Sequence, residues 1–196
     1  MTRIKVVNGL SLPFFPMRPV KGVAVCTAKA AEALHAEIAD THLWTIQPKL
    51  GGDRACLAVV DDKVYVQNRL GSWYKHPVKN AEAFKELGNG TCFDGEVYDG
   101  RFCVFDLLAL KGKSFVRASA GEREVMARAT VQLIGQPWVF DPPSRAWLCK
   151  LRRNGPQWEG VVLKRTLSPY IPLGSATQSS PNWIKKLFAS RSHQPN

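Results

Sequence analysis

The sequence predicts an α+β domain of largely antiparallel sheets flanked by helices. Runs rich in β-branched and aromatic residues come in neighbouring pairs joined by short turns, which is typical of β-hairpins. Segments with apolar residues at helical spacing stand between these pairs. Hairpins mixed with helices in this way indicate antiparallel sheets.

The first half of the chain contains two predicted helices and one predicted hairpin. The alanine-rich segment 27–40 has apolar residues at helical spacing. Segments 57–60 and 64–66 are β-rich runs on either side of a polar turn, which predicts a hairpin. Segment 80–87 is predicted to be a helix that ends at Gly88, because glycine commonly follows the last helical residue.

The strongest hairpin signal and the strongest helix start come next. Segments 92–98 and 101–107 flank Asp99-Gly100, a dipeptide that suits a two-residue hairpin turn. Segment 119–122 (Ser-Ala-Gly-Glu) is a capping box, in which serine and glutamate satisfy free N–H groups at the start of a helix. The apolar stripe of this helix is predicted to be Val125, Met126, Ala129 and Leu133.

The last part of the chain has one more predicted helix and one more predicted strand. Segment 141–155 opens with Asp-Pro-Pro and carries several cations, which predicts a basic helix. Segment 160–165 is typical of a buried strand and ends in two cations. Segment 175–196 is mostly polar. We therefore expect one domain over residues 1–190 and a flexible tail, 191–196.

Length and composition restrict the class of protein. A chain of 196 residues suits one well-packed domain. No apolar run reaches the roughly 18 residues of a membrane helix, and the N-terminal stretch lacks the apolar core of a signal peptide. The five cysteines show no C-x-x-C spacing and the four histidines no ligand pattern. We expect a soluble cytoplasmic monomer with reduced thiols, no structural metal and no membrane partner.

The charge balance favours a polyanionic partner. The chain has 27 Lys and Arg against 16 Asp and Glu, a formal net charge of +11. Cations that neutralise phosphates release counterions, so this excess favours nucleic acid. Six Trp, nine Phe and four Tyr are available for stacking on bases. The charge suggests a partner but not a chemistry, because many soluble proteins are basic.

Three short stretches place charged residues where a core strand would be apolar. Stretch 47–54 (QPKLGGDR) puts a lysine near a glycine pair, where bare backbone lets a phosphate approach. Stretch 93–97 (FDGEV) carries Asp94 and Glu96 two residues apart, so both side chains point to one face of a strand. Stretch 159–164 (EGVVLK) has an acid at one end and a base at the other. Taken singly, each is more often a turn, a solvated face or an edge strand.

In this order, the stretches resemble the covalent nucleotidyltransferase superfamily of ATP-dependent DNA ligases, RNA ligases and mRNA capping enzymes. The family's first motif, K-x-D-G-x-R, is matched by Lys49, Gly52 and Arg54. Its D-G-E strand is matched by Asp94-Gly95-Glu96. Its arginine element, F-D element, E-G-hydrophobic-K strand and closing W-x-K are matched by Arg69, Phe105-Asp106, residues 159–164 and Trp183-Ile184-Lys185.

The sequence departs from this family in three places. Gly51 stands where the first motif usually has aspartate, and Leu187 stands at the second lysine of W-x-K-x-K. The sequence also ends soon after Trp183. The resemblance therefore implies a nucleotidyltransferase (ATP-grasp-like) domain without an oligonucleotide-binding (OB-fold) domain. The chain resembles an ATP-dependent DNA ligase reduced to its adenylation domain.

The resemblance assigns Lys49 as the nucleophile that attacks the α-phosphate of ATP and then carries AMP. Lys164 and Lys185 are expected to lower the pKa of this amine by charge repulsion and to neutralise phosphate charge. Glu159 is expected to hold Mg²⁺, or Mn²⁺, and Glu96 is a second candidate metal ligand.

The nucleoside and the nucleic acid are assigned to a further group of side chains. By resemblance, Glu96 hydrogen-bonds the ribose and Phe105 stacks on the base. Gln47 has an amide that can accept from the N6 amine of adenine. Arg54 and Arg69 are candidates for binding the cofactor, the 5′-phosphate or the ribose on the 3′ side.

The expected reaction is sealing of nicked or cohesive-ended duplex DNA, as in DNA repair or replication. An RNA ligase or an RNA/DNA hybrid end-joining enzyme is the first alternative, because contacts to 2′-hydroxyls decide the substrate. A capping guanylyltransferase would use GTP, and a non-catalytic nucleic-acid-binding module would have no use for the motif lysines. So small a core would suit a virus or a phage.

Overall fold

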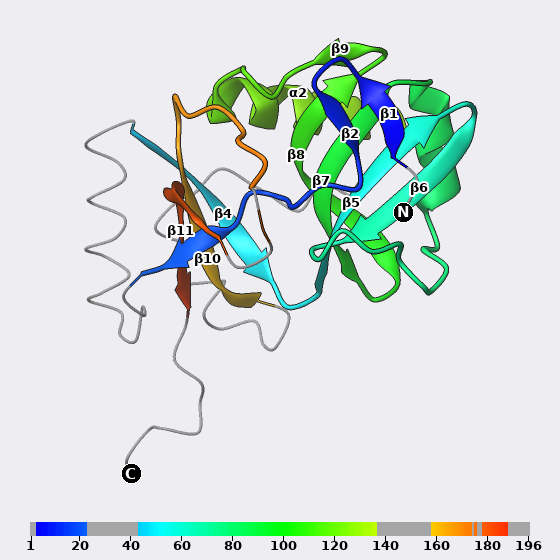
Figure 1. Cartoon of the computed structure of the whole chain (residues 1–196). Helices are drawn as coiled ribbons and strands as arrows, with labels where there is room; N and C mark the ends of the chain where they lie inside the picture. Colours follow the sequence, from blue (N-terminus) through cyan, green and yellow to red (C-terminus); the bar gives the residue numbers. More distant parts are fainter. Residues whose placement is uncertain (1–2, 23–42, 137–157, 174, 176–177, 188–196) are drawn as a thin grey trace. The chain divides into compact units, whose positions relative to one another are not determined.

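The computed structural model describes residues 3–22, 43–136, 158–173, 175 and 178–187 (Figure 1). The predicted helices 27–40 and 141–155 and the predicted tail 191–196 lie outside these residues. The chain forms two compact units, and each unit is built from three separate segments of the sequence. Unit 1 comprises Met1–Arg18, Gly52–Val139 and Leu167–Ser179, and unit 2 comprises Pro19–Gly51, Phe140–Thr166 and Ser180–Asn196. The expectation of a single domain stays a prediction.

Unit 1 is built on a five-stranded antiparallel sheet with the strand order β6-β5-β7-β8-β9. Both hairpins predicted from the sequence are confirmed. In the turn between β7 and β8, Asp99 and Gly100 have φ of 49° and 70°, which is the backbone that a two-residue hairpin turn requires. The strands are β5 (Asp53–Val60), β6 (Lys63–Asn68), β7 (Thr91–Tyr98), β8 (Arg101–Leu110) and β9 (Lys113–Ser114).

The main hydrophobic core of unit 1 joins this sheet to two helices. The predicted helix 80–87 is a 3-10 helix, η1 (Ala81–Leu87), and the capped helix is α2 (Ala120–Leu133). The ring of Phe84 from η1 makes edge contacts with the rings of Phe93 and Phe102, at centroid distances of 5.5 and 5.6 Å. Further members of the core are Ala55, Leu57, Val59, Val97, Val104, Leu107, Ala127 and Val131.

The start of α2 agrees with the sequence, but its buried face does not. The capping box is confirmed, because Ser119 accepts from the Glu122 N–H and Glu122 accepts from the Ser119 N–H. The predicted apolar stripe is wrong at Val125 and Leu133, which are 67% and 84% exposed, whereas Met126 packs against the core. The polar residue Arg123 points into the core because it forms an ion pair there. This ion pair decides which face of α2 is buried. The buried residues of α2 are Ala120, Arg123, Ala127, Thr130 and Val131.

A second layer of unit 1 is formed by segments from opposite ends of the chain. The antiparallel hairpin of β1 (Ile4–Val7) and β2 (Leu10–Leu12) packs against β5. The residues after it approach the segment 167–173, and Phe15 forms a backbone bridge with Leu173. The side chain of Gln67 ties this layer to the sheet through bonds of 3.0 and 2.7 Å to the backbone of Phe14.

Unit 2 contains a four-stranded sheet with the order β3-β11-β10-β4. Strand β10 is antiparallel to both neighbours, whereas β3 runs parallel to β11. The strand predicted at 160–165 is confirmed as part of β10. The strands are β3 (Pro19–Lys21), β4 (Trp44–Leu50), β10 (Trp158–Arg165) and β11 (Ser180–Leu187).

The expected fold class is therefore confirmed at the level of α+β structure with mostly antiparallel sheets. Within the described ranges, no helix has both the length and the apolar character needed to cross a membrane. The three described cysteines, Cys56, Cys92 and Cys103, are free and buried, as expected for reduced thiols.

Candidate functional site

Strand register in unit 2 brings four sequence-predicted residues to one face of its sheet. Val162 lies opposite Gln47 on β4 and opposite Lys185 on β11. Lys49 lies opposite Gly160, two residues before Val162, and Lys164 follows two residues after it. Because side chains alternate along a strand, these residues share a face. The structure thus brings together Gln47, Lys49, Lys164 and Lys185.

Lys49 forms an ion pair with Glu159 and also donates a hydrogen bond of 3.3 Å to the Leu50 carbonyl. The pairing of β10 with β4 shifts by one residue between Trp158 and Gly160. This β-bulge leaves Glu159 as the extra residue, which re-aims its side chain. The lysine and glutamate side chains are 23% and 48% exposed, so both can reach a ligand from solvent.

Two glycines let the backbone pass close to these charged groups. A Cβ atom on Gly160 would collide with the Lys186 carbonyl oxygen and would lie 2.7 Å from the Leu187 Cα. A Cβ atom on Gly51 would lie 3.2 Å from both Cγ and Oε1 of Glu159. Since Gly51 replaces the aspartate usual in the first motif, an acid there would stand directly beside the Glu159 carboxylate.

Lys164 is fixed by the tryptophan of the closing motif. Its Nζ lies 4.2 Å from the centroid of the Trp183 ring, which is the geometry of a cation–π contact. The two residues are only 2% and 1% exposed, so this contact is shielded from water. The sequence identified Trp183 as part of a motif, but the structure shows that it holds the neighbouring lysine.

In unit 1, the D-G-E strand pairs with the arginine of the first motif. The Asp94 carboxylate accepts from Arg54 Nε at 3.0 Å and from Nη2 at 2.5 Å. Burial alone would lower the pKa of Arg54, but the charge and hydrogen bonds of Asp94 raise it above the ordinary value. The guanidinium carbon lies 5.1 Å from the centroid of the Phe105 ring, so the arginine is charged and supports the predicted base-stacking residue.

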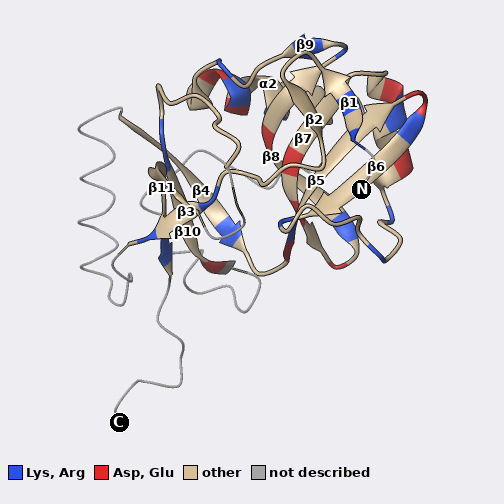
Figure 2. Cartoon of the chain, in the orientation of Figure 1, with Lys and Arg blue, Asp and Glu red and all other residues tan. Residues whose placement is uncertain are grey.

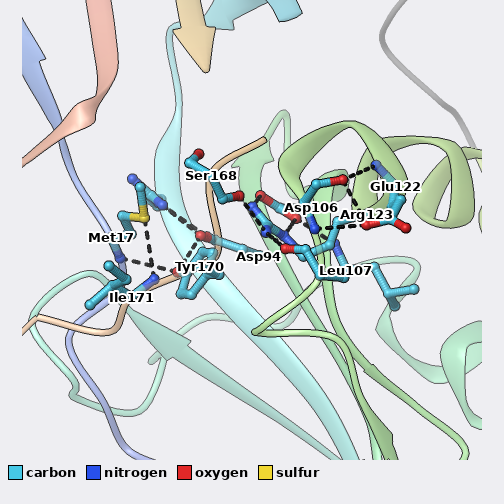
Figure 3. A network of polar contacts seen from close by, with 12 residues as sticks. Met17, Asp94, Asp106, Leu107, Glu122, Arg123, Ser168, Tyr170 and Ile171 are labelled. Carbon is cyan, nitrogen blue, oxygen red and sulfur yellow. Dashed lines mark hydrogen bonds and ion pairs between the residues drawn. The ribbon is translucent and has the colours of Figure 1, made fainter. Parts of the chain in front are cut away.

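The buried Asp94 carboxylate has two further donors that the sequence did not predict, of which Figure 3 shows Tyr170. The Tyr170 hydroxyl donates to Oδ2 at 2.7 Å, and the Cys56 thiol lies 3.7 Å from Oδ1. Burial, followed by the negative charge of Asp94, raises the pKa of both Tyr170 and Cys56 well above ordinary values. Both groups therefore stay protonated at neutral pH and remain donors to the carboxylate.

The aspartate of the F-D element takes part in a second buried ion pair, also shown in Figure 3. Asp106 accepts from Arg123 Nε at 2.8 Å and from Nη2 at 3.3 Å. Arg123 Nη1 donates to the carbonyls of Ala118 and Ser168, at 2.6 and 3.2 Å. Since Asp106 follows Phe105 directly, this pair fixes the backbone beside the predicted stacking ring.

The remaining predicted residues are found at separate places in unit 1. Glu96 of β7 lies opposite Arg54 on the neighbouring strand β5 and opposite Cys103 on the other neighbour, β8. Burial and the charge of Glu96 raise the pKa of Cys103. Arg69 is exposed in the turn after β6, and the structure assigns it no role.

Within the part of the chain that the structure describes, no three His, Cys, Asp or Glu side chains gather to form a metal site. Mg²⁺ is usually held by one or two carboxylates together with waters and substrate phosphates. The half-exposed carboxylate of Glu159, beside Lys49, is a donor of this kind.

Several solved structures share this fold. Mycobacterial DNA ligase D complexed with ATP and MES aligns with a TM-score of 0.66 and 19% identity over 89% of this chain and 60% of its own. The ligase domain from M. tuberculosis LigD aligns with a TM-score of 0.66 and 18% identity, over 89% of this chain and 59% of its own. The structure Pmar-Lig_Pre aligns with a TM-score of 0.57 and 17% identity, over 89% of this chain and 47% of its own.

The chain therefore resembles the adenylation domain of an ATP-dependent ligase, and the likeness concerns the fold. It spans about 60% of the length of the mycobacterial DNA ligase D structure. No protein-family model matches the sequence, and neither does any curated protein.

Proposed function

We propose that this chain, which has the fold of a ligase adenylation domain, is the nucleotidyltransferase core of an ATP-dependent polynucleotide ligase. The observation that carries the proposal is the sheet face of unit 2. There Gln47, Lys49, Lys164 and Lys185 share one side, and Glu159 pairs with Lys49. A nucleophilic amine, cations for phosphate charge and a carboxylate for a metal are the groups that nucleotidyl transfer to lysine needs.

In the first step, the Lys49 amine attacks the α-phosphorus of ATP. A P–N bond forms, the bond to the bridging oxygen breaks, and pyrophosphate leaves while the amine gives up its proton. Lys164 and Lys185 lie on the same face and stabilise the charged phosphate oxygens. Glu159 would hold Mg²⁺ or Mn²⁺, which supplies additional charge neutralisation at the phosphates.

Three side chains are assigned to the nucleoside. Gln47 recognises the adenine edge, Phe105 stacks on the base and Glu96 bonds the ribose, with Glu96 as a further metal-ligand candidate. The contact of Arg54 with Phe105 supports a role for this arginine at the nucleotide.

Sealing then needs two more transfers. An oxygen of a 5′-phosphate attacks the lysyl-bound phosphorus, which releases the Lys49 amine and forms a 5′-adenylated end. A 3′-hydroxyl next attacks that 5′-phosphorus, a phosphodiester forms and AMP leaves. We propose a nick in duplex DNA as the substrate, and RNA ends are the alternative. Arg54 and Arg69 are the candidates for holding the 5′-phosphate or the 3′-side ribose.

The test is covalent labelling. The purified chain is incubated with α-³²P-labelled ATP or GTP and Mg²⁺, and is then separated by denaturing electrophoresis. We expect label from ATP, complete loss of label in Lys49→Arg, and normal labelling in Lys63→Arg, which changes an exposed lysine on β6. Absence of label, or peptide mapping that finds AMP on Lys164 or Lys185, would contradict the proposal. Label from GTP would favour a capping enzyme.

Substrate class is a separate measurement. The labelled protein is chased with nicked DNA duplexes and with nicked RNA duplexes of the same sequence. Faster transfer of AMP to the DNA end is expected, and faster transfer to the RNA end would make the chain an RNA ligase.

A further inference from the structure

Tyr170 is held in place by contacts on every part of the residue. Its backbone N–H donates to the Val116 carbonyl at 2.8 Å, and the Arg123 guanidinium carbon lies 5.6 Å from its ring centroid. The Phe14 ring meets it edge-on, with a centroid distance of 6.5 Å. Only 2% of the residue is exposed. Such a ring cannot turn away from its partner without disturbing the packing around it.

The hydroxyl of Tyr170 lies between the N-terminal segment and the D-G-E strand (Figure 3). It accepts from the Met17 backbone N–H at 3.1 Å and donates to Asp94 Oδ2 at 2.7 Å. Because the Met17 N–H occupies an acceptor site of the hydroxyl, its proton is directed to the carboxylate. The same carboxylate oxygen accepts from Arg54 Nη2, so the position of Tyr170 determines where the guanidinium can lie.

These contacts form a continuous path to the predicted base-stacking ring. Met17 orients the Tyr170 hydroxyl, the hydroxyl orients Asp94, and Asp94 holds Arg54 by two hydrogen bonds. Arg54 then lies against the Phe105 ring. All members of the path are in unit 1.

We propose that Tyr170 is a positioning residue for the nucleotide site, acting through Asp94 on Arg54 and Phe105. This inference rests on the proposed function, since it takes Phe105 and Arg54 as contacts of the bound nucleotide. A hydroxyl at this place affects the binding of ATP, because it orders the surface that receives the base. It does not affect the attack by Lys49, to which no member of the path belongs.

The substitution Tyr170→Phe removes the hydroxyl and keeps the ring. We expect the ATP concentration that gives half-maximal labelling to rise about tenfold, which is the lower end of the effect of a hydrogen bond to a charged group. The labelling rate at saturating ATP is expected to stay within about twofold of the wild-type rate. All variants are assayed well below their unfolding temperatures, so that a difference in stability leaves the result unaffected.

Tyr74→Phe is the matched control, because the Tyr74 hydroxyl also donates to a carboxylate, Asp53 Oδ2, at 3.2 Å. This control is expected to leave half-saturation unchanged. A second variant, Asp94→Asn, is expected to raise half-saturation on its own, and adding Tyr170→Phe to it should have little further effect, since both act along one path.

The outcomes separate the inference from the proposed function. A wild-type chain that takes no label overturns the proposed function and this inference with it. A labelled wild type with unchanged half-saturation in Tyr170→Phe overturns the inference alone, even where the unfolding temperature falls. Full additivity of Tyr170→Phe and Asp94→Asn also overturns it, because the two groups would then act separately.

Discussion

At the scale of single residues, the pair Lys49–Glu159 joins the proposed nucleophile to the proposed metal ligand. A lysine amine is a nucleophile only when it is neutral. A glutamate that bonds the protonated amine therefore opposes the reaction until its carboxylate is engaged elsewhere. Binding of a divalent ion by Glu159 would remove this opposition and add positive charge near the amine.

Glu159→Ala is accordingly expected to lower the rate of label transfer from ATP by a factor on the order of a hundred, through loss of metal-assisted charge stabilisation. The rate is measured over a Mg²⁺ titration. Glu82→Ala is the control, because Glu82 is an exposed acid that also pairs with a lysine, Lys85. A Glu159 variant with near-normal rates at limiting Mg²⁺ would contradict the assigned role.

The sequence identified the charged residues of the glycine-containing motifs, but not the side chains and backbone groups that fix their positions. Asp94 and Glu96 were expected on one face of a strand, and the register confirms it: Arg54 pairs with Glu96 and Cys56 with Asp94. Tyr170 lies 76 residues from Asp94 in sequence and 153 from Met17. No local pattern encodes contacts over such separations, so only the fold reveals them.

At the scale of elements, β10 and β11 approach each other so closely that a side chain at residue 160 has no room. The glycine of the E-G motif is therefore a packing requirement of the sheet that carries Lys164 and Lys185. The bulge at Glu159 lies directly before this glycine.

We expect Gly160→Ala to lower the free energy of unfolding by roughly 3 kcal/mol, since overpacking against rigid backbone is costly. The measurement is urea denaturation. Gly112→Ala is the control: φ is 84° there and a Cβ would meet nothing within 4 Å, so only the backbone cost of about 1 kcal/mol applies. Equal losses in the two variants would show that the contact with β11 is unimportant.

Local signals predicted the elements whose ends are determined by their own sequence. The hairpin turn at Asp99-Gly100 and the capping box at Ser119 need only neighbouring residues, and both are confirmed. The buried face of α2 depends instead on Asp106 of β8, which draws Arg123 inward. Counting apolar residues could not show this, and the predicted stripe was consequently wrong at Val125 and Leu133.

At the scale of the whole molecule, the excess of cations is the dominant property. The formal net charge is +11. Figure 2 shows Lys and Arg on strands of both units. Phosphate contacts from such a surface carry no information on base identity, so varied sequences are expected to bind alike.

Binding of nicked DNA is expected to weaken steeply with salt. If about five phosphates are neutralised, affinity falls roughly five-hundredfold between about 50 and 200 mM salt. Fluorescence anisotropy of a labelled nicked duplex across a salt series gives the slope, and an intact duplex of the same sequence is the reference. A flat profile would show that phosphate neutralisation contributes little to the affinity.

The ribosome synthesises this chain from its N-terminus. Because each unit is built from segments that are separated in sequence, the order of synthesis decides which contacts can form first. The hairpins β5–β6 and β7–β8 pair strands that are neighbours in sequence, and they are complete once Leu110 has left the exit tunnel. Tyr170 is synthesised 153 residues after its partner Met17, and Glu159 is synthesised 110 residues after its partner Lys49. A nascent chain therefore carries the proposed nucleophile long before its acid partner, and the proposed nucleotidyl transfer becomes possible only after β10 has been synthesised.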